Sequence, residues 1–170
     1  MNADDSAVPM FPAGRWRVDP VHSSVAFQVV DAVGTIATVR GRFRDFEGTL
    51  ETGHDLAHGH AEGVVRVASL TTDNSERDED LLSPNFFDAA AYPEIRFESR
   101  EIRPVDRELR IDGTLTLQET PREFGVTAHV RRVGRDRSGN ERLALEGTSE
   151  LDWAETTAKI TVELSLTHDQ

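Results

Sequence analysis

Histidines are the side chains in this chain that most readily suggest chemistry, because imidazole binds metal ions and moves protons near neutral pH. Three of them, His54, His58 and His60, lie in one short segment beside Asp55. Spacings of four and two residues would let the three rings converge on one ion if the segment folds around it. The segment has no regular hydrophobic pattern, however, and a loop of this kind positions ligands poorly. A solvated loop is therefore the simpler interpretation, and a metal-assisted hydrolase that uses these histidines is kept as an alternative.

Nucleophilic catalysis finds little support in the sequence. His22 is followed by Ser23, but neighbouring residues on a strand face opposite sides and cannot pair as base and nucleophile. His22 is instead expected to form a structural hydrogen bond at the start of a strand. The chain contains no cysteine, no Gly-x-Ser-x-Gly motif and no phosphate-cradling glycine loop. The sequence therefore predicts a protein that is not an enzyme, needs no cofactor and has no dedicated metal site.

An acidic segment offers a different kind of polar group. Ser75 precedes Arg77, Asp78, Glu79 and Asp80, and this order predicts a short helix that Ser75 could cap, with acidic residues in its first turn. The carboxylates of such a run usually face solvent. Arg77 has two open roles: an ion pair that fixes the turn, which we favour, or presentation of its guanidinium to an anion.

Aromatic residues cluster directly after this segment. Phe86, Phe87, Tyr92 and Phe97 are close in sequence, and the chain holds eight phenylalanines against one tyrosine. Ordinary core packing would explain them. The alternative is the lining of an apolar tunnel, in which Phe86 and Phe87 plug one end of a barrel. The sequence favours neither interpretation.

The elements that would position these residues are strands, because most of the chain alternates with period two. Eight or nine strands are expected. The clear segments are 25–29, 64–67, 95–99, 109–117, 124–130, 143–149 and 160–166, and two weaker ones are 35–42 and 43–51. Many antiparallel strands with short turns form a sandwich or a closed barrel. Small residues on the inward parity (Gly113, Ala128, Gly147 and Ser149) favour a barrel with a hollow over a filled sandwich.

Length and charge limit the classes of partner. The 170 residues fit one domain, which we place at 14–170 after a flexible tail at 1–13. A formal net charge of −12 disfavours binding to nucleic acid or to an anionic membrane surface. No stretch is long enough to span a bilayer, and the first residues do not form a signal peptide. The sequence thus predicts a cytoplasmic protein without stable membrane insertion.

Four ordered segments resemble the YceI-like family of lipid- and polyisoprenoid-binding proteins. They are WRVDPVHSSVAFQV (16–29), VRGRFRDFEGTLE (39–51), RDEDLLSPNFFDAAAYPEIRFES (77–99) and IDGTLTL (111–117). The resemblance covers about residues 16–130, whereas the segments at 118–124 and 148–157 depart from the family pattern.

The resemblance implies an all-β fold, an eight-stranded antiparallel lipocalin-like β-barrel with a short helical crossover near residues 75–90. It implies a soluble carrier that holds an isoprenoid-type lipid, such as a polyprenyl pyrophosphate or a quinone, in an apolar cavity. No catalytic residues are attached to the family motif, and homodimers are common among relatives. Within the motif, Arg77 and Asp78 would anchor the crossover while Phe86 and Phe87 turn inward. Its polar positions are Asp19, His22, Ser23, Arg77 and Asp78.

The inward parity together with the crossover gives a predicted apolar lining for the ligand. Its members are Val25, Phe27, Val29, Phe43, Phe86, Phe87, Phe97, Leu115, Leu117, Phe124 and Val126. A shift of one residue on any strand would turn its whole set to the wrong face. Beside the carrier and the metal-assisted hydrolase, a third hypothesis is a stress-related barrel that is filled by its own side chains.

Overall fold

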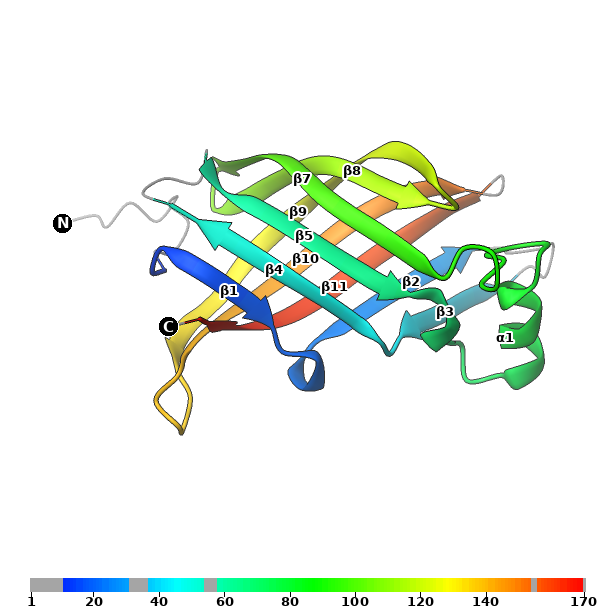
Figure 1. The fold of residues 1–170 in the computed structure, drawn as a ribbon, viewed down its shortest axis with the longest axis horizontal. Helices are drawn as coiled ribbons and strands as arrows, with labels where there is room; N and C mark the ends of the chain where they lie inside the picture. Colours follow the sequence, from blue (N-terminus) through cyan, green and yellow to red (C-terminus); the bar gives the residue numbers. More distant parts are fainter. Residues whose placement is uncertain (1–10, 31–36, 54–57, 154–155, 170) are drawn as a thin grey trace.

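The structure, a computed structural model, describes residues 11–30, 37–53, 58–153 and 156–169. These residues form antiparallel strands and one α-helix, α1 (Ser75–Leu82) (Figure 1). The strands are β1 (Gly14–Val18), β2 (Ser24–Val30), β3 (Thr38–Phe43), β4 (Phe46–Thr52), β5 (His60–Arg66), β6 (Leu70–Thr71), β7 (Glu94–Val105), β8 (Glu108–Leu117), β9 (Thr120–Arg135), β10 (Glu141–Trp153) and β11 (Thr156–His168).

The sheet closes on itself through its first strand. β1 pairs with β4 on one side and with β11 on the other, so that β1, β4, β5 and β7–β11 form a ring of eight antiparallel strands. The remaining strands extend the wall toward α1: β2 pairs with β11 and β3, and β3 pairs with β6. The predicted eight-stranded antiparallel barrel is confirmed.

A bend at Asp19 and Pro20 divides the first long strand into β1 and β2. Between β1 and β2 the chain makes a single 3-10 turn, Pro20–His22, which Asp19 caps by accepting a hydrogen bond from the backbone of Val21. Proline suits the first position of such a turn because it has no backbone N–H to leave unpaired. Both halves then pair with β11. The Asp-Pro step therefore bends the strand without removing it from the sheet.

The predicted strands are found, with some boundaries misplaced. Val67 begins a 3-10 turn after β5, and residues 35 and 36 of the predicted strand 35–42 lie outside the described residues. Phe43 ends β3 instead of opening the next strand, and Arg44 and Asp45 separate it from β4. The inward parity changes at this point, from Val39 and Phe43 on β3 to Phe46 and Leu50 on β4, and the prediction did not use this sign of a bend. The β9–β10 connection is a hairpin loop in which the Asp136 carboxylate accepts from the backbones of Ser138 and Asn140.

The crossover contains the helix in its first part only. α1 covers residues 75–82, and hydrogen-bonded turns carry the chain from Ser83 to Tyr92. The helix cap is Asn74, whose side chain accepts from the backbone of Arg77, and not Ser75 as the sequence suggested. Asparagine and serine cap helices about equally well, so composition could not choose between them. β7 begins at Glu94, directly after Pro93.

The end of the barrel away from α1 is packed. Trp16 lies at its centre with no exposed surface, and Phe11 meets it edge to face with ring centroids 5.9 Å apart. Trp16 Nε1 also donates to the carbonyl of Pro12 at 3.0 Å. Of the predicted tail at 1–13, residues 1–10 lie outside the described part of the chain, while Phe11 and Pro12 are attached to the barrel.

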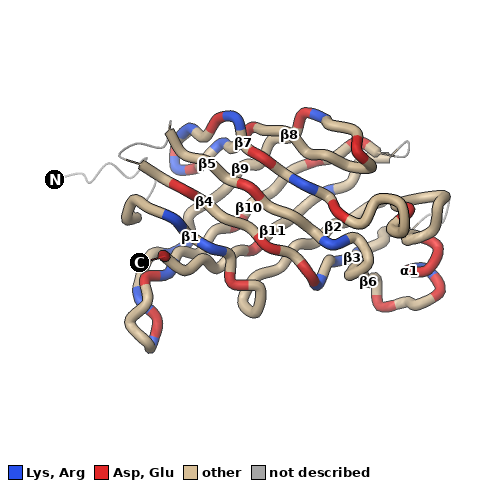
Figure 2. The backbone as a smooth tube through the Cα atoms, in the orientation of Figure 1, with Lys and Arg blue, Asp and Glu red and all other residues tan. Residues whose placement is uncertain are grey.

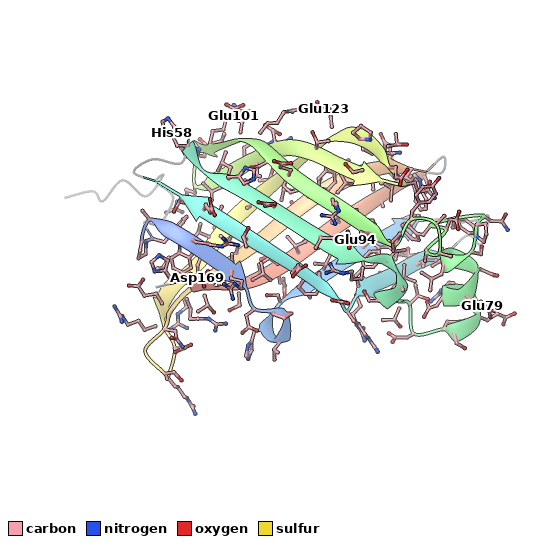
Figure 3. The ribbon with its side chains drawn as sticks, in the orientation of Figure 1. His58, Glu79, Glu94, Glu101, Glu123 and Asp169 are labelled. Atoms are coloured by element: carbon pink, nitrogen blue, oxygen red, sulfur yellow. The ribbon has the colours of Figure 1, made fainter. Side chains whose placement is uncertain are left out.

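Acidic and basic residues are interspersed along the strands of the barrel (Figure 2). Glu123 points away from the barrel wall (Figure 3). The pair Arg66–Glu47 at 2.8 Å bridges the neighbouring strands β5 and β4, and the pair Arg100–Glu123 at 2.6 Å reaches from β7 across β8 to β9. Exposed pairs of this kind add little stability each. They leave the inner face to apolar residues, as the period-two pattern requires.

Candidate ligand cavity

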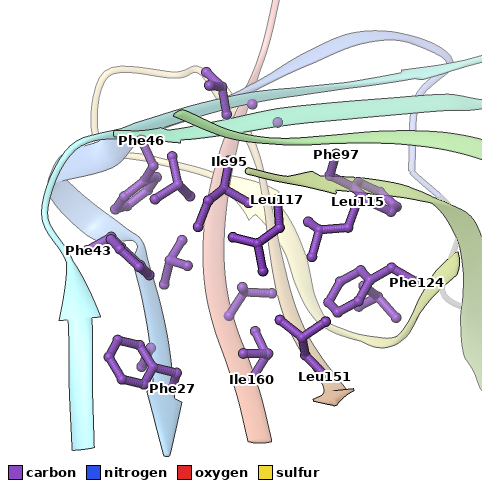
Figure 4. Close-up of a pocket in the computed structure, with 18 of the residues that line it drawn as sticks. Phe27, Phe43, Phe46, Ile95, Phe97, Leu115, Leu117, Phe124, Leu151 and Ile160 are labelled. Atoms are coloured by element: carbon purple, nitrogen blue, oxygen red, sulfur yellow. The ribbon is translucent and has the colours of Figure 1, made fainter. Parts of the chain in front are cut away.

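The half of the barrel nearest α1 encloses a cavity of about 330 Å³. Its wall is formed by apolar side chains from β1–β5 and β7–β11, among them Phe27, Phe97 and Leu115 (Figure 4), and by Leu81, Phe86 and Phe87 of the crossover. Glu47 and Glu62 belong to the strands of this wall. Their carboxylates are paired on the outer face, with Arg66 at 2.8 Å and with His60 at 3.5 Å. The cavity is therefore suited to an apolar ligand.

The structure places every residue of the predicted lining along this cavity. The set is Val25, Phe27, Val29, Phe43, Phe86, Phe87, Phe97, Leu115, Leu117, Phe124 and Val126. The predicted parity thus matches the observed inward face on β2, β7, β8 and β9. Contact of these side chains with a ligand stays a prediction.

Sequence reasoning missed 25 of the 36 residues that form the wall in the described part of the chain. Most of the missing members lie on β4, β5, β10 and β11 and include Phe46, Gly48, Gly63, Leu145, Leu151, Trp153, Ile160, Val162 and Leu164. On β10 and β11 the signal was available, because Leu145 and Ile160 share the parity of strands that the pattern had already identified. On β4 and β5 the two glycines carry no hydrophobic signal, so alternation could not point to them.

An aromatic chain crosses the α1 end of the cavity. Phe27 contacts Phe43 with ring centroids 5.7 Å apart, and Phe43 meets Phe87 edge to face at 6.1 Å. Phe87 then stacks on Trp153 at 4.6 Å, which links the crossover to the end of β10. Aromatic pairs in these geometries add about 0.5–1.5 kcal/mol each beyond the area they bury. The prediction that Phe86 and Phe87 turn inward from the crossover agrees with this arrangement.

The four small inward residues that suggested a hollow barrel do not create the cavity. A Cβ on Gly113 would lie 2.2 Å from the carbonyl oxygen of Glu98, and one on Gly147 would lie 2.8 Å from Val162. Neighbouring atoms therefore fill the space at both positions. Ala128 is part of the packed core, and the hydroxyl of Ser149 donates to the Gly125 carbonyl. The interpretation of these four small residues as the source of the hollow is wrong.

The open position in the wall is instead Gly63, which faces Gly48 across β5 and β4. A Cβ on Gly63 would meet only the Glu47 carbonyl oxygen, at 3.5 Å, which is an ordinary contact distance. A Cβ on Gly48, in contrast, would lie 3.2 Å from both Val18 and the Glu62 carbonyl oxygen. Gly63 also lies opposite Phe97 on β7, so its missing side chain leaves room beside that ring.

Three of the polar motif residues, Asp19, His22 and Ser23, stabilise the bend between β1 and β2 by hydrogen bonds. The Asp19 carboxylate lies 2.8 Å from Arg142 Nη2 and 2.7 Å from His22 Nδ1. The hydrogen bond from Arg142, then that from His22, lowers the pKa of Asp19 to about 2. The Ser23 hydroxyl oxygen accepts from the backbone N–H of Ser165 at 2.9 Å. These bonds tie the bend to β10 and β11, a structural arrangement outside the cavity.

Arg77 and Asp78 converge on Thr72 rather than on each other. Arg77 donates from Nε to Thr72 Oγ1 at 2.8 Å and from Nη2 to the Thr72 carbonyl at 2.9 Å. Asp78 Oδ1 accepts from the backbone N–H of Thr72 at 2.8 Å and from its hydroxyl at 2.6 Å. Both side chains anchor α1 to the segment after β6, and this contact replaces the ion pair that we favoured for Arg77.

A third contact with the crossover was not anticipated. Gln118, in the turn between β8 and β9, donates from Nε2 to the carbonyls of Phe86 at 2.6 Å and Phe87 at 3.2 Å. Gln118 and Glu119 both have positive φ, 52° and 58°. Two-residue hairpins require this conformation, but glycine or asparagine adopts it more easily. The turn that departs from the family pattern thus holds the aromatic residues over the cavity.

The histidine segment is only partly described. His54 and Asp55 lie outside the described residues. His60 Nε2 is 3.5 Å from Glu62 and 3.8 Å from Glu98. Across the described ranges, no group of three or more His, Asp or Glu side chains is arranged to hold a metal ion. The same residues include no helix with the length and apolar character needed to cross a membrane.

The fold matches solved structures of low sequence identity. BcnA of Burkholderia cenocepacia superposes with a TM-score of 0.76 at 19% identity, covering 87% of this chain and 98% of that one. A polyisoprenoid binding domain from Saccharophagus degradans, implicated in plant cell wall breakdown, superposes with a TM-score of 0.68 at 15% identity, covering 91% and 98%. At these identities the likeness establishes the fold.

Sequence comparison extends the match beyond the four motifs. UPF0312 proteins of Vibrio cholerae and Vibrio parahaemolyticus are 32% and 31% identical over 137 and 138 residues, which is 77% and 79% of this chain and 69% and 71% of theirs. A UPF0312 protein of Photorhabdus laumondii is 29% identical over 65% of this chain, which spans 58% of that relative's length. The family model of the YceI-like domain matches residues 16–167, so the region of β10 and β11 is included. The chain belongs to the YceI-like family.

Proposed function

We propose that the chain binds an isoprenoid-type lipid and holds the apolar part of the lipid in the barrel cavity. The observation that carries this proposal is the cavity itself, which is walled by aliphatic and aromatic side chains with the carboxylates of its strands paired outside. A structural neighbour is described as a polyisoprenoid binding domain, which supports the same ligand class. Carriage of a polyprenyl pyrophosphate or a quinone-like lipid is the finer form of this proposal.

The physical reason for binding is the removal of the chain from water. Burial of one methylene contributes about 0.8 kcal/mol, so a five-carbon isoprene unit contributes roughly 4 kcal/mol before ordering costs. No covalent step is needed for this activity, and the proposal is a binding protein rather than an enzyme. The cavity also disfavours a barrel that is filled by its own side chains throughout.

Phe27→Asp tests whether the cavity is the site. The Phe27 ring lies in the cavity wall, over Gly41 of β3, where a Cβ would be only 2.3 Å from the ring. A carboxylate at this position would be desolvated by a bound chain, so we expect the affinity for farnesol to fall by at least about a hundredfold. The measurement is an equilibrium titration with farnesol as the probe, with circular dichroism to check folding.

Val30→Asp is the matched control. Val30 is on the same strand with the opposite parity and is 62% exposed. The same apolar-to-acidic change there should leave farnesol affinity within about twofold, because surface substitutions away from special features have small effects. Equal affinities for folded Phe27→Asp and for the unaltered protein would show that farnesol does not use this cavity.

A further inference from the structure

We infer that the cavity selects short isoprenoid chains, of two to three isoprene units, because the other half of the barrel is closed by its own side chains. This inference rests on the proposed function and adds a length limit to it. The limit is set by residues at the junction between the hollow half and the packed half.

A floor of core side chains ends the cavity. Six residues belong both to the packed cluster and to the cavity wall: Val18, Phe46, Leu50, Ile111, Leu145 and Leu166. They come from β1, β4, β8, β10 and β11, so the floor is formed from several sides of the barrel. A chain that enters past the crossover would meet this floor end on.

Behind the floor the barrel is filled. Trp16, Leu109 and Leu143 have no exposed surface and Ile102 has 1%, and these four belong to the cluster without reaching the cavity. The register places Leu109 opposite Ala128 and Trp16 opposite Leu50. Interiors packed in this way have few voids larger than a water molecule. A ligand chain could continue only by displacing several buried side chains at once.

The cavity volume sets the number of carbon atoms. An apolar protein cavity of about 150 Å³ holds benzene, with six carbons. On the same scale a cavity of 330 Å³ holds about thirteen carbons, which is between two and three five-carbon units. Any further unit would lie outside the mouth, beyond Phe87 and Trp153.

The experiment is a chain-length series with the full chain. Geraniol, farnesol, geranylgeraniol and a polyprenol of eight isoprene units are titrated, and the complexes are weighed by native mass spectrometry. We expect affinity to rise at least about tenfold from geraniol to farnesol, because most of the added unit is buried. We expect affinity to rise by less than about threefold from farnesol to the longer alcohols, because their added isoprene units stay in water or at the cavity mouth.

Two variants move the limit in opposite directions. Ile111→Ala removes floor atoms and should raise the affinity for geranylgeraniol relative to farnesol. Ile102→Ala, the same change behind the floor, should leave this ratio unchanged. Gly63→Leu adds a side chain at the open position of the wall, where a Cβ would make an ordinary contact. It should lower the affinity for farnesol more than the affinity for geraniol.

Outcomes separate the length limit from the proposed function. A steady gain in affinity up to eight units would overturn the length limit while supporting lipid binding. No binding at any length would overturn the proposed function and the limit together. If Ile111→Ala does not fold, the chain-length series on the unaltered protein and on Gly63→Leu still tests the length limit.

Discussion

Single residues fix the shape of this barrel through contacts that are far apart in sequence. Asp19 receives Arg142 from β10 and His22 from the adjoining turn, and in this way joins the bend of the first strand to the opposite end of the chain. Gly63 acts by lacking a side chain, at a position where a Cβ would meet only one ordinary contact. The barrel thus combines residues that stabilise its frame with a residue that leaves space in its wall.

Asp19→Asn should lower the free energy of unfolding near neutral pH by about 1–2 kcal/mol, because a charge-assisted acceptor becomes a neutral one. The pKa of Asp19 is lowered from 3.8 to about 2. A carboxyl with a lowered folded-state pKa stabilises the fold above its unfolded pKa, and this contribution is lost as pH falls through the folded value. The difference between the variant and the unaltered protein should therefore shrink between pH 4 and pH 2.

Urea denaturation at a series of pH values measures this difference. Asp80→Asn is the control, since Asp80 is exposed on α1 and is far from the Asp19 contacts. Asp80→Asn should change the free energy of unfolding by no more than about 0.5 kcal/mol. A deficit in Asp19→Asn that is constant from pH 7 to pH 2 would show that the ionised carboxylate is not what stabilises the bend.

At the scale of elements, the crossover and the β8–β9 turn act together at the cavity mouth. α1 is held by two side chains on Thr72, and the turns after it are held by Gln118 and by stacking on Trp153. The β8–β9 turn carries two non-glycine residues at positive φ, which costs roughly 1 kcal/mol or more per residue. A side-chain amide at this turn compensates by binding the crossover.

Gln118→Ala should accelerate release of farnesol about fivefold, because loss of one to two hydrogen bonds loosens the crossover by about 1 kcal/mol. Stopped-flow dissociation of preformed complex measures the rate. Gln28→Ala, the same change on β2 with the outward parity, should leave the rate unchanged. An unaltered rate in a folded Gln118→Ala variant would mean that release does not require movement of Phe86 and Phe87.

Period-two alternation predicted the strands and their inward faces because each strand has one wet and one dry side. It did not predict the bend at Asp19 or the boundary after Phe43, although the inward parity changes at both, from Val18 to Val25 and from Phe43 to Phe46. The predicted helix cap was displaced by one residue because Asn74 and Ser75 cap helices about equally well. The hydrogen bond from Gln118 to the Phe86 carbonyl joins residues that are 32 positions apart in sequence, and no local sequence pattern predicts such a contact.

At the scale of the whole molecule, the sequence could not separate the hollow half from the filled half. Small inward residues suggested a hollow, but whether a small residue leaves space depends on what lies opposite. Gly113 lies against the backbone of β7 and Gly147 against valines, whereas a Cβ on Gly63 would meet only one ordinary contact. The resemblance to the YceI-like family added the closed barrel and the ligand class, neither of which alternation could give.

The whole molecule is a strongly acidic barrel with an apolar interior, and the central claim is that this interior holds an isoprenoid chain. A homodimer, which the family resemblance raised as an alternative to a monomer, would be visible by its mass in the same experiment that tests this claim. That experiment is native mass spectrometry of the protein as purified, followed by organic extraction and lipid analysis. The account predicts a near-stoichiometric adduct whose extract contains an isoprenoid lipid, and exchange of that adduct for added farnesol. A ligand-free mass that does not shift with farnesol or with a quinone would contradict it.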